Sequence, residues 1–196
     1  METLVKLDIF ILQFFNIGLS NPVLDAVMEV LSNRNVWLIV AAISIAVATL
    51  TKNKRTLYAC FAIGITVILS DWVSYEWLKP FFGRHRPCYD ASLALRAVVD
   101  GCGSQLGFPS NHAANGMSAA LVGWFILGRR WGLVMVVAVF LVGLSRVYLG
   151  LHFPSDVAGG FLFSIIFSAL GLVTARLIAR LTAQVFRQWT YFRSEN

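Results

Sequence analysis

The chain has 196 residues, of which 58% are hydrophobic and only 13% are charged. That charged fraction is about half of the roughly 25% usual for soluble domains, which excludes an ordinary water-soluble enzyme. The formal net charge of +6 does not indicate nucleic-acid binding, because the basic residues gather at the ends of apolar runs, where membrane topology requires them.

The first 35 residues predict amphipathic helices that lie at the membrane interface. The polar side chains of residues 3–20 fall mostly on one side of a helix and the apolar ones on the other, with Asp8 out of place. Pro22 breaks this helix, and residues 23–32 form a second short one. We expect no cleavable signal peptide, since a basic start and a small-residue cleavage site are both missing.

Five apolar segments are predicted to cross the membrane, since each approaches the roughly 20 residues that a bilayer requires. They cover residues 36–50, 56–78, 109–127, 131–148 and 154 to about 175, and a long polar loop occupies residues 79–107. If residues 4–20 also cross, the count is six. We therefore expect residues 1–196 to form a single all-α domain, a polytopic membrane helix bundle of five or six transmembrane helices plus N-terminal interfacial helices.

Basic residues cluster at positions 52–55, 129–130 and 176–193, which the predicted membrane topology puts on one side of the membrane. By the positive-inside rule that side is the cytoplasm. The loops at 79–107 and 149–153 then both face outward, whichever number of spans is correct. We expect an integral protein, of the bacterial inner membrane, with its active site on the periplasmic side.

The three cysteines differ in their surroundings. Cys60 lies inside an apolar run and is expected to be an ordinary buried residue. Cys88 and Cys102 bracket a polar stretch of the outer loop, and a disulfide between them would require an oxidising compartment. Spacing alone leaves the disulfide and the free thiols equally open, because it does not establish the geometry.

Polar side chains gather at three places on the predicted outer face. They are KPFFGRHRP at 79–87, PSNH at 109–112 and SRVYLGLHFPSD at 145–156. Each lies at the end of a predicted span, so the threading brings all three together on one face. These polar side chains are not needed for helix packing. Ionisable groups at a membrane boundary are usually functional.

The first half of this set suits a phosphate group. Lys79, Arg86 and Arg146 supply three fixed positive charges, and arginine binds phosphate oxygens in bidentate fashion. Ser110 and Asn111 begin a predicted helix, whose free N–H groups and dipole favour an anion. We therefore interpret these five residues as phosphate ligands.

The other half can carry out the chemistry. His112 and His152 supply acid–base or nucleophilic capacity, and Asp156 can reach back to a ring nitrogen of His152. The acids of the outer face, Asp90, Asp100 and Asp156, are too scattered for a divalent-metal site, which would need several oxygen ligands. The set favours phosphoryl transfer without a metal or any other cofactor.

Together these residues resemble the three-part signature of the type 2 phosphatidic acid phosphatase superfamily. Its members include membrane lipid phosphatases, bacterial acid phosphatases and vanadium-dependent haloperoxidases. The motifs occur in the family's order and spacing, as Lys79-x6-Arg86-Pro87, Pro109-Ser110-x-His112 and Ser145-Arg146-x5-His152-x3-Asp156. The core that they define covers about residues 55–175.

The resemblance implies a role for each matching residue. His152 would be the nucleophile that forms a phosphohistidine, Asp156 would orient it, and His112 would be the general acid. The phosphate would be bound by Lys79, Arg86, Ser110, the backbone at Asn111, and Arg146. The family usually has glycine at position 111, and because asparagine tolerates the left-handed region we expect altered contacts there but no loss of activity.

Other polar residues receive more ordinary interpretations. Arg84 and His85 fall on variable positions of the first motif and are expected to make secondary contacts at most. Arg96 is expected to anchor the chain at the interface. Asp71 lies inside a span and must find a partner, so we expect a structural hydrogen bond for it.

These observations predict a lipid phosphate phosphatase, and undecaprenyl pyrophosphate is the substrate that we expect. Phosphatidylglycerol phosphate, phosphatidic acid and lipid A 1-phosphate are the alternatives, because the motif residues bind the phosphate group and do not contact the lipid tail of the substrate. A lipid-to-lipid phosphotransferase is a second hypothesis, and a lipid-binding protein with a relic site is a third. The expected partners are the lipid substrate and the bilayer, with no nucleic acid, and the oligomeric state stays open.

Overall fold

The computed structural model describes residues 2–194 of the chain, with side chains described for residues 3–183. Arg187 and Arg193, from the predicted C-terminal basic cluster, lie outside the described side chains. The described residues form helices joined by loops, and no β-strand occurs among them. In chain order the elements are α1 (Glu2–Gln13), η1 (Phe14–Gly18), α2 (Pro22–Ser32), α3 (Arg34–Leu50), α4 (Lys54–Val73), η2 (Ser74–Leu78), α5 (Lys79–Phe82), η3 (Pro87–Tyr89), η4 (Ala91–Leu93), α6 (Asn111–Leu127), α7 (Arg129–Tyr148) and α8 (Pro154–Ser194).

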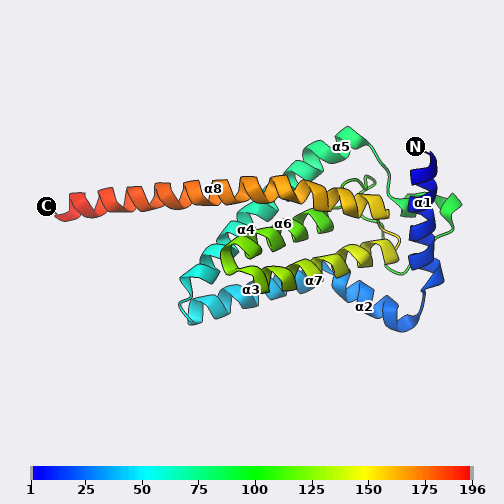
Figure 1. Cartoon of the computed structure of the whole chain (residues 1–196), viewed down its shortest axis with the longest axis horizontal. Helices are drawn as coiled ribbons and strands as arrows, with labels where there is room; N and C mark the ends of the chain where they lie inside the picture. Colours follow the sequence, from blue (N-terminus) through cyan, green and yellow to red (C-terminus); the bar gives the residue numbers. More distant parts are fainter. Residues whose placement is uncertain (1, 195–196) are drawn as a thin grey trace.

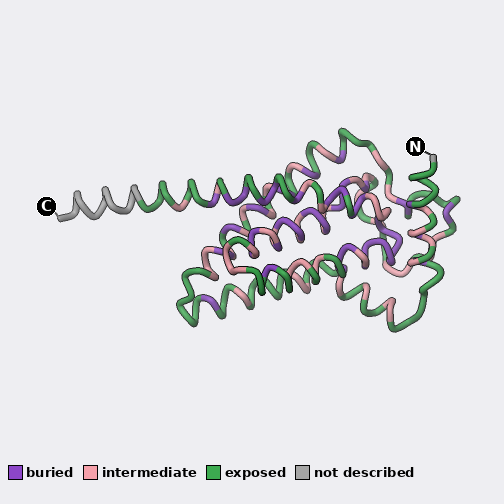
Figure 2. The backbone as a smooth tube through the Cα atoms, in the orientation of Figure 1, coloured by how far each residue is buried: buried purple, intermediate pink, exposed green. Residues whose placement is uncertain are grey.

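Helix α6 lies at the centre of the bundle and packs against α4, α7 and α8 (Figure 1). The buried positions concentrate along it, whereas α3 is mostly exposed (Figure 2). Small residues allow this close packing. A Cβ atom added at Gly160 of α8 would lie 2.7 Å from the carbonyl oxygen of Ser110 and 2.8 Å from the Cβ of Ala113. Glycine at this position therefore brings α8 against the start of α6.

The all-α membrane bundle predicted from the sequence is confirmed. Within the part of the chain that the structure describes, three helical stretches are long and apolar enough to cross a membrane, namely Lys54–Phe82, Arg129–Tyr148 and Pro154–Ala183. Helices α1 and α2 would be a fourth if they count as one span, although they are bent by 120°. Helices α3 and α6 have 17 residues each, which is just below the length that a bilayer usually requires. The predicted count of five or six spans stays a prediction.

The two ends of the bundle differ in chemistry, as the threading predicted. At one end lie the α3–α4 and α6–α7 turns, and the Nε atom of Arg55 donates to the carbonyl of Ile126 at 2.5 Å between them. At the other end lie the loop at 83–110, the α7–α8 connection and the N-terminal helices (Figure 1). All three predicted polar clusters share this second end, called the site end below.

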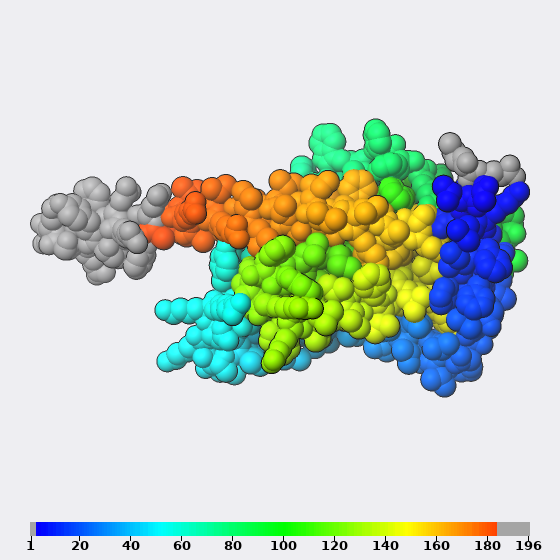
Figure 3. Space-filling view, in the orientation of Figure 1, coloured from blue at the N-terminus to red at the C-terminus, as the bar shows by residue number. Residues whose placement is uncertain are grey.

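Helix α1 lies across the site end, against the α7–α8 connection (Figures 1 and 3). The buried side chain of Asn16 fixes it there, because its Nδ2 donates to the carbonyl of Tyr148 at 2.8 Å and its Oδ1 accepts from the backbone N–H of Arg96 at 2.8 Å. The Oδ1 of Asn21 then caps α2 by accepting from the N–H of Leu24 at 2.9 Å. The N-terminal helices are thus built onto the site by specific polar contacts.

Candidate active site

His152 and Asp156 lie where α7 ends and α8 begins. The backbone N–H groups of Leu151 and His152 donate to the carbonyl of Arg146 at 3.0 and 3.2 Å, which folds the connection back onto the last turn of α7. The Nδ1 atom of His152 then lies 3.3 Å from the Oδ2 atom of Asp156. The same Oδ2 accepts from the N–H of Phe153 at 3.0 Å, so the carboxylate is held on two sides.

His152 is 1% exposed, and its surroundings keep the ring neutral. Burial, followed by the positive charges of Arg86, Arg146 and Lys79, holds the pKa of His152 well below its usual range. A neutral imidazole whose Nδ1–H faces a carboxylate has a lone pair on its other nitrogen. That is the form of histidine that acts as a nucleophile.

The start of α6 lies beside this pair. The N–H of Ser110 donates to the carbonyl of Asp156 at 3.0 Å, which ties the beginnings of α6 and α8 together. Ser110 is fully buried, and its Oγ has no hydrogen-bond partner among the described residues. A buried hydroxyl without a partner, next to the free N–H groups of a helix N-terminus, suits an anionic ligand.

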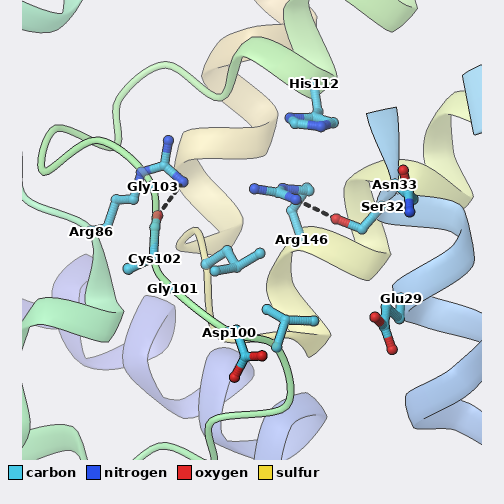
Figure 4. Close-up of a pocket in the computed structure, with 12 residues that line it drawn as sticks. Glu29, Ser32, Asn33, Arg86, Asp100, Gly101, Cys102, Gly103, His112 and Arg146 are labelled. Carbon is cyan, nitrogen blue, oxygen red and sulfur yellow. Dashed lines mark hydrogen bonds between the residues drawn. The ribbon is translucent and has the colours of Figure 1, made fainter. Parts of the chain in front are cut away.

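A cavity of about 470 Å³ lies at the site end, lined by residues that neighbour these groups in sequence, among them His112 and Leu151. Arg86, His112 and Arg146 line one side of it, and Figure 4 shows their side chains directed into the same space. Arg146 is 8% exposed, and its Nε has no partner among the described residues. One of its Nη atoms donates to the Oγ of Ser32 at the end of α2. The volume is within the range of small-molecule sites.

Arg86 is positioned by the loop that follows it. Its Nη1 donates to the carbonyl of Cys102 at 3.0 Å, and its Nη2 donates to the Oγ of Ser104 at 3.2 Å. Cys88 and Cys102 form a disulfide, with their Cα atoms 6.2 Å apart. Of the two alternatives that the sequence left open, the structure therefore has the disulfide, and the closed loop holds the carbonyl that orients Arg86.

Lys79 is buried but does not point freely into the cavity. Its Nζ donates to the carbonyls of Leu106, Gly107 and Pro109, at 3.1, 3.4 and 3.1 Å. All three ammonium protons can therefore be used in holding the segment that leads into α6. The predicted direct contact of Lys79 with phosphate stays a prediction. The positive charge of Lys79 does act on the site, because it helps to lower the pKa of His152.

The structure thus brings the predicted residues together in two groups. Arg86, His112 and Arg146 face the cavity, whereas Lys79, Ser110, His152 and Asp156 lie buried beside it. The side chain of Asn111 turns away and its Nδ2 donates to Asp71 at 2.8 Å, whereas the predicted contact of its backbone with phosphate stays a prediction.

Asp71 has the structural hydrogen bonds that the sequence predicted. Its Oδ1 accepts from Asn111 and also from the Nδ2 of Asn115 at 2.9 Å, which joins α4 to the first two turns of α6. Asn111 is not among the residues with positive φ. Our explanation of Asn111 by tolerance of the left-handed region was therefore wrong, and helix pairing through Asp71 takes its place.

Sequence reasoning missed the roles of Arg84 and Asp8. The Nη1 of Arg84 donates to the Oδ1 of Asp156 at 2.8 Å, and its Nη2 donates to the Oδ2 of Asp8 at 2.6 Å. Asp8 also accepts from the N–H of Ser155 at 2.9 Å. The only available signal was the out-of-place charge of Asp8 on an otherwise amphipathic helix, because its partners are 76 and 147 residues away.

Comparisons with known proteins find a matching family and several relatives. A family model described as the PAP2 superfamily matches residues 55–185. The chain is 33% identical over 167 residues to a lipid A 4'-phosphatase of Bacteroides thetaiotaomicron, covering 82% of this chain and 73% of that protein. It is 37% identical over 125 residues to a decaprenylphosphoryl-5-phosphoribose phosphatase of Mycobacterium tuberculosis, covering 63% of each.

A solved structure shares the fold. The transmembrane PAP2 type phosphatidylglycerolphosphate phosphatase of Bacillus subtilis superposes with a TM-score of 0.63 at 23% sequence identity. The match covers 91% of this chain and 89% of that one. The likeness extends beyond the residues that the family model matches and includes most of the N-terminal region.

Proposed function

The chain belongs to the PAP2 superfamily and is one of its membrane phosphatases, and on this premise we propose that it hydrolyses the phosphate monoester of a lipid A-type glycolipid. The observation that carries the proposal is the shared cavity, in which Arg86, His112 and Arg146 converge beside the buried pair of His152 and Asp156. Two guanidinium groups and a helix N-terminus supply what a phosphate dianion needs.

The names of the relatives support the choice of substrate. The two reported above act, by name, on lipid A and on a decaprenylphosphoryl phosphoribose, which both carry phosphate on a sugar. These names favour a phosphosugar monoester over undecaprenyl pyrophosphate, which was our first expectation. Undecaprenyl pyrophosphate, phosphatidylglycerol phosphate and phosphatidic acid become the competing substrates of the test.

The first step of the proposed mechanism is phosphoryl transfer to His152. The imidazole lone pair attacks phosphorus, an N–P bond forms, and the bond from phosphorus to the glycolipid oxygen breaks. His112, protonated once the bound phosphate dianion offsets the neighbouring positive charges, gives its proton to the departing oxygen, and Asp156 stabilises the charge that develops on the imidazole of His152. Arg86, Arg146 and the first amides of α6 stabilise the negative charge on the transferring group.

The second step returns the enzyme to its starting state. His112, now neutral, takes a proton from a water molecule as that water attacks the phosphohistidine. The N–P bond breaks, inorganic phosphate leaves, and His152 is again a neutral imidazole. Each residue ends in its original protonation state, so the cycle balances.

We also propose that the site end faces the periplasm of a bacterial inner membrane. The basic clusters at 52–55 and 129–130 lie at the opposite end, as the positive-inside rule requires. The disulfide between Cys88 and Cys102 lies at the site end and suits an oxidising compartment. Cysteine labelling of intact cells with a membrane-impermeant reagent, using an introduced cysteine at Ser92, tests the orientation.

The test of activity is phosphate release by the purified protein in detergent with EDTA present. The panel is lipid A, phosphatidic acid, phosphatidylglycerol phosphate and undecaprenyl pyrophosphate. We expect release from lipid A to be fastest, and we expect His152→Ala to abolish it. A brief reaction with ³²P-labelled lipid A should leave acid-labile label on the wild-type protein.

Three results would count against the proposal. Release that persists in His152→Ala would exclude the phosphohistidine, and release restricted to undecaprenyl pyrophosphate would exclude the glycolipid. Label that passes into a second lipid and not into inorganic phosphate would identify a phosphotransferase. His112→Asn serves as the internal check, because a substrate with a good leaving group, such as p-nitrophenyl phosphate, should lose less activity than lipid A does.

A further inference from the structure

The cavity has a second wall whose chemistry is opposite to that of the phosphate site. Glu29 and Asn33, from the end of α2 and the residue after it, line it together with Asp100 and the peptide groups around Gly101 and Gly103. Figure 4 shows the carboxylates of Glu29 and Asp100 on the far side of Arg146 from His112. The cavity therefore has a cationic side and an acidic side.

The acidic wall does not suit the phosphate itself. Two carboxylates repel a phosphate dianion, so they would lower the affinity of a site that bound phosphate alone. Neither Glu29 nor Asp100 has an ion-pair or hydrogen-bond partner among the residues that the structure describes. Their acceptor oxygens are free for another part of a ligand.

The position of the phosphate is fixed independently of this wall. The Nε of Arg146 and the Oγ of Ser110 are both buried without partners among residues 3–183, and Arg146 is only 8% exposed. Buried polar atoms of this kind call for a ligand. A phosphate that satisfied them, with its leaving oxygen at His112, would place the rest of the ligand in the same cavity, which Glu29 and Asp100 also line.

We infer that Glu29 and Asp100 form a subsite for the sugar that carries the phosphate, and that this subsite makes the protein select phosphosugar lipids. Hydroxyl and amide N–H groups of a sugar are donors, and carboxylates are strong acceptors for them. An isoprenyl chain has no such donors, and neither does a glycerol whose other two oxygens are esterified. The inference rests on the proposed function and adds the residues that choose its substrate.

Both residues lie outside the three sequence motifs. Glu29 also lies outside residues 55–185, which the family model matches. The motif residues bind the group that all substrates of the family share, so a separate set of residues has to recognise the group that differs. The end of α2 and the loop around Asp100 are in the right place to do so.

The experiment compares two substrates in the same mixed micelles, lipid A and phosphatidic acid. The variants are Glu29→Ala, Asp100→Ala and the double variant, with Glu29→Gln and Asp100→Asn as conservative forms. The readout is the ratio of kcat/KM for lipid A to kcat/KM for phosphatidic acid. We expect each alanine variant to lower that ratio about tenfold, the size of one lost charge-assisted hydrogen bond, and the amide variants to lower it less.

Glu76→Ala is the matched control, because Glu76 is an exposed acid of η2 that does not line the cavity. Its ratio should equal that of the wild type. An unchanged ratio in the double variant, or an increase in activity on both substrates from relief of repulsion, would overturn the subsite. If the wild type released phosphate from neither lipid, the proposed function itself would fail, which is a different result.

Discussion

The Nη1 atom of Arg84 lies 2.8 Å from the Oδ1 atom of Asp156. This contact uses the carboxylate oxygen that does not face His152, so the two oxygens of Asp156 have separate partners. Because Arg84 also binds Asp8 of α1 at 2.6 Å, the orientation of Asp156 depends on a helix that precedes the family's motifs. Asp8 and Arg84 are therefore positioning residues, which act on the reaction only through Asp156.

Arg84→Gln and Asp8→Asn should each lower kcat on lipid A about tenfold or more, with a smaller change in KM. Loss of either contact leaves Asp156 free to rotate away from Nδ1 of His152, whereas the phosphate ligands stay in place. Steady-state kinetics in detergent measure the split. Asp8→Glu should recover part of the lost kcat.

Asp90→Asn is the control for this pair, because Asp90 is an exposed acid of the same outer region that caps Ser92, which asparagine also does. A change in KM with kcat unchanged would argue for a purely structural role. The same conclusion would follow if Arg84→Gln, Asp8→Asn and Asp8→Glu all failed to give folded protein in size-exclusion chromatography.

His152 should remain neutral when ordinary imidazoles become charged. Its pKa is lowered in the folded protein, so lowering the pH through about 6.5 should protonate a free imidazole but leave His152 unprotonated. NMR of protein labelled at its three histidines, in micelles from pH 8 to pH 5.5, measures this directly, with the signal assigned by His152→Ala. A His152 signal that titrates with free histidine would contradict the prediction. The unfolded chain would bind the extra proton, so stability should also fall as pH drops below about 6.5.

Opening the disulfide should weaken phosphate binding. In the Cys88→Ser and Cys102→Ser double variant, the loop that holds the carbonyl accepting from Arg86 is no longer closed. We expect KM to rise about 3- to 10-fold while kcat changes less, because charge-assisted contacts to phosphate are lost in binding. Reduced wild-type protein should behave like the variant. Cys60→Ser is the control, and an identical KM for oxidised and reduced protein would refute this role.

Asn111→Gly restores the residue that is usual in the family and removes one hydrogen bond to Asp71. We expect a loss of about 1 kcal/mol of stability, the usual net value of one hydrogen bond, and less than a threefold change in kcat. The backbone of Asn111 needs no positive φ, so its contribution to the phosphate site should survive. Thermal unfolding in detergent and kinetics on lipid A measure the two effects. An Asp71→Asn variant that lost activity but not stability would show that the pairing serves the reaction.

The sequence predicted what is encoded locally. The apolar runs gave the helices of the bundle, and the three motifs gave the residues that meet at the site end, because their spacing within each segment is short. The Cys88–Cys102 pair was visible but undecided, since spacing carries no geometry.

Contacts across the chain were not predictable in the same way. Asp8, Arg84 and Asp156 are separated by 76 and 72 residues, and no periodicity relates them. Asn111 was expected to contribute its backbone to the phosphate site, but the hydrogen bond of its side chain to Asp71 of α4 could not be predicted from the sequence. Lys79 was expected at the phosphate, yet three loop carbonyls accept its hydrogen bonds.

The bond from Arg146 to Ser32 has a consequence for how substrate preference can change in such proteins. Ser32, Glu29 and Asn33 belong to a segment that contains none of the motif residues, yet they touch the same cavity as the arginines. A hybrid chain carrying residues 22–33 of another member would keep its catalytic groups and Asp8, and would replace Glu29 and Asn33 while leaving Asp100 in place. Part of the head-group preference would then change with a segment that contains no motif residue.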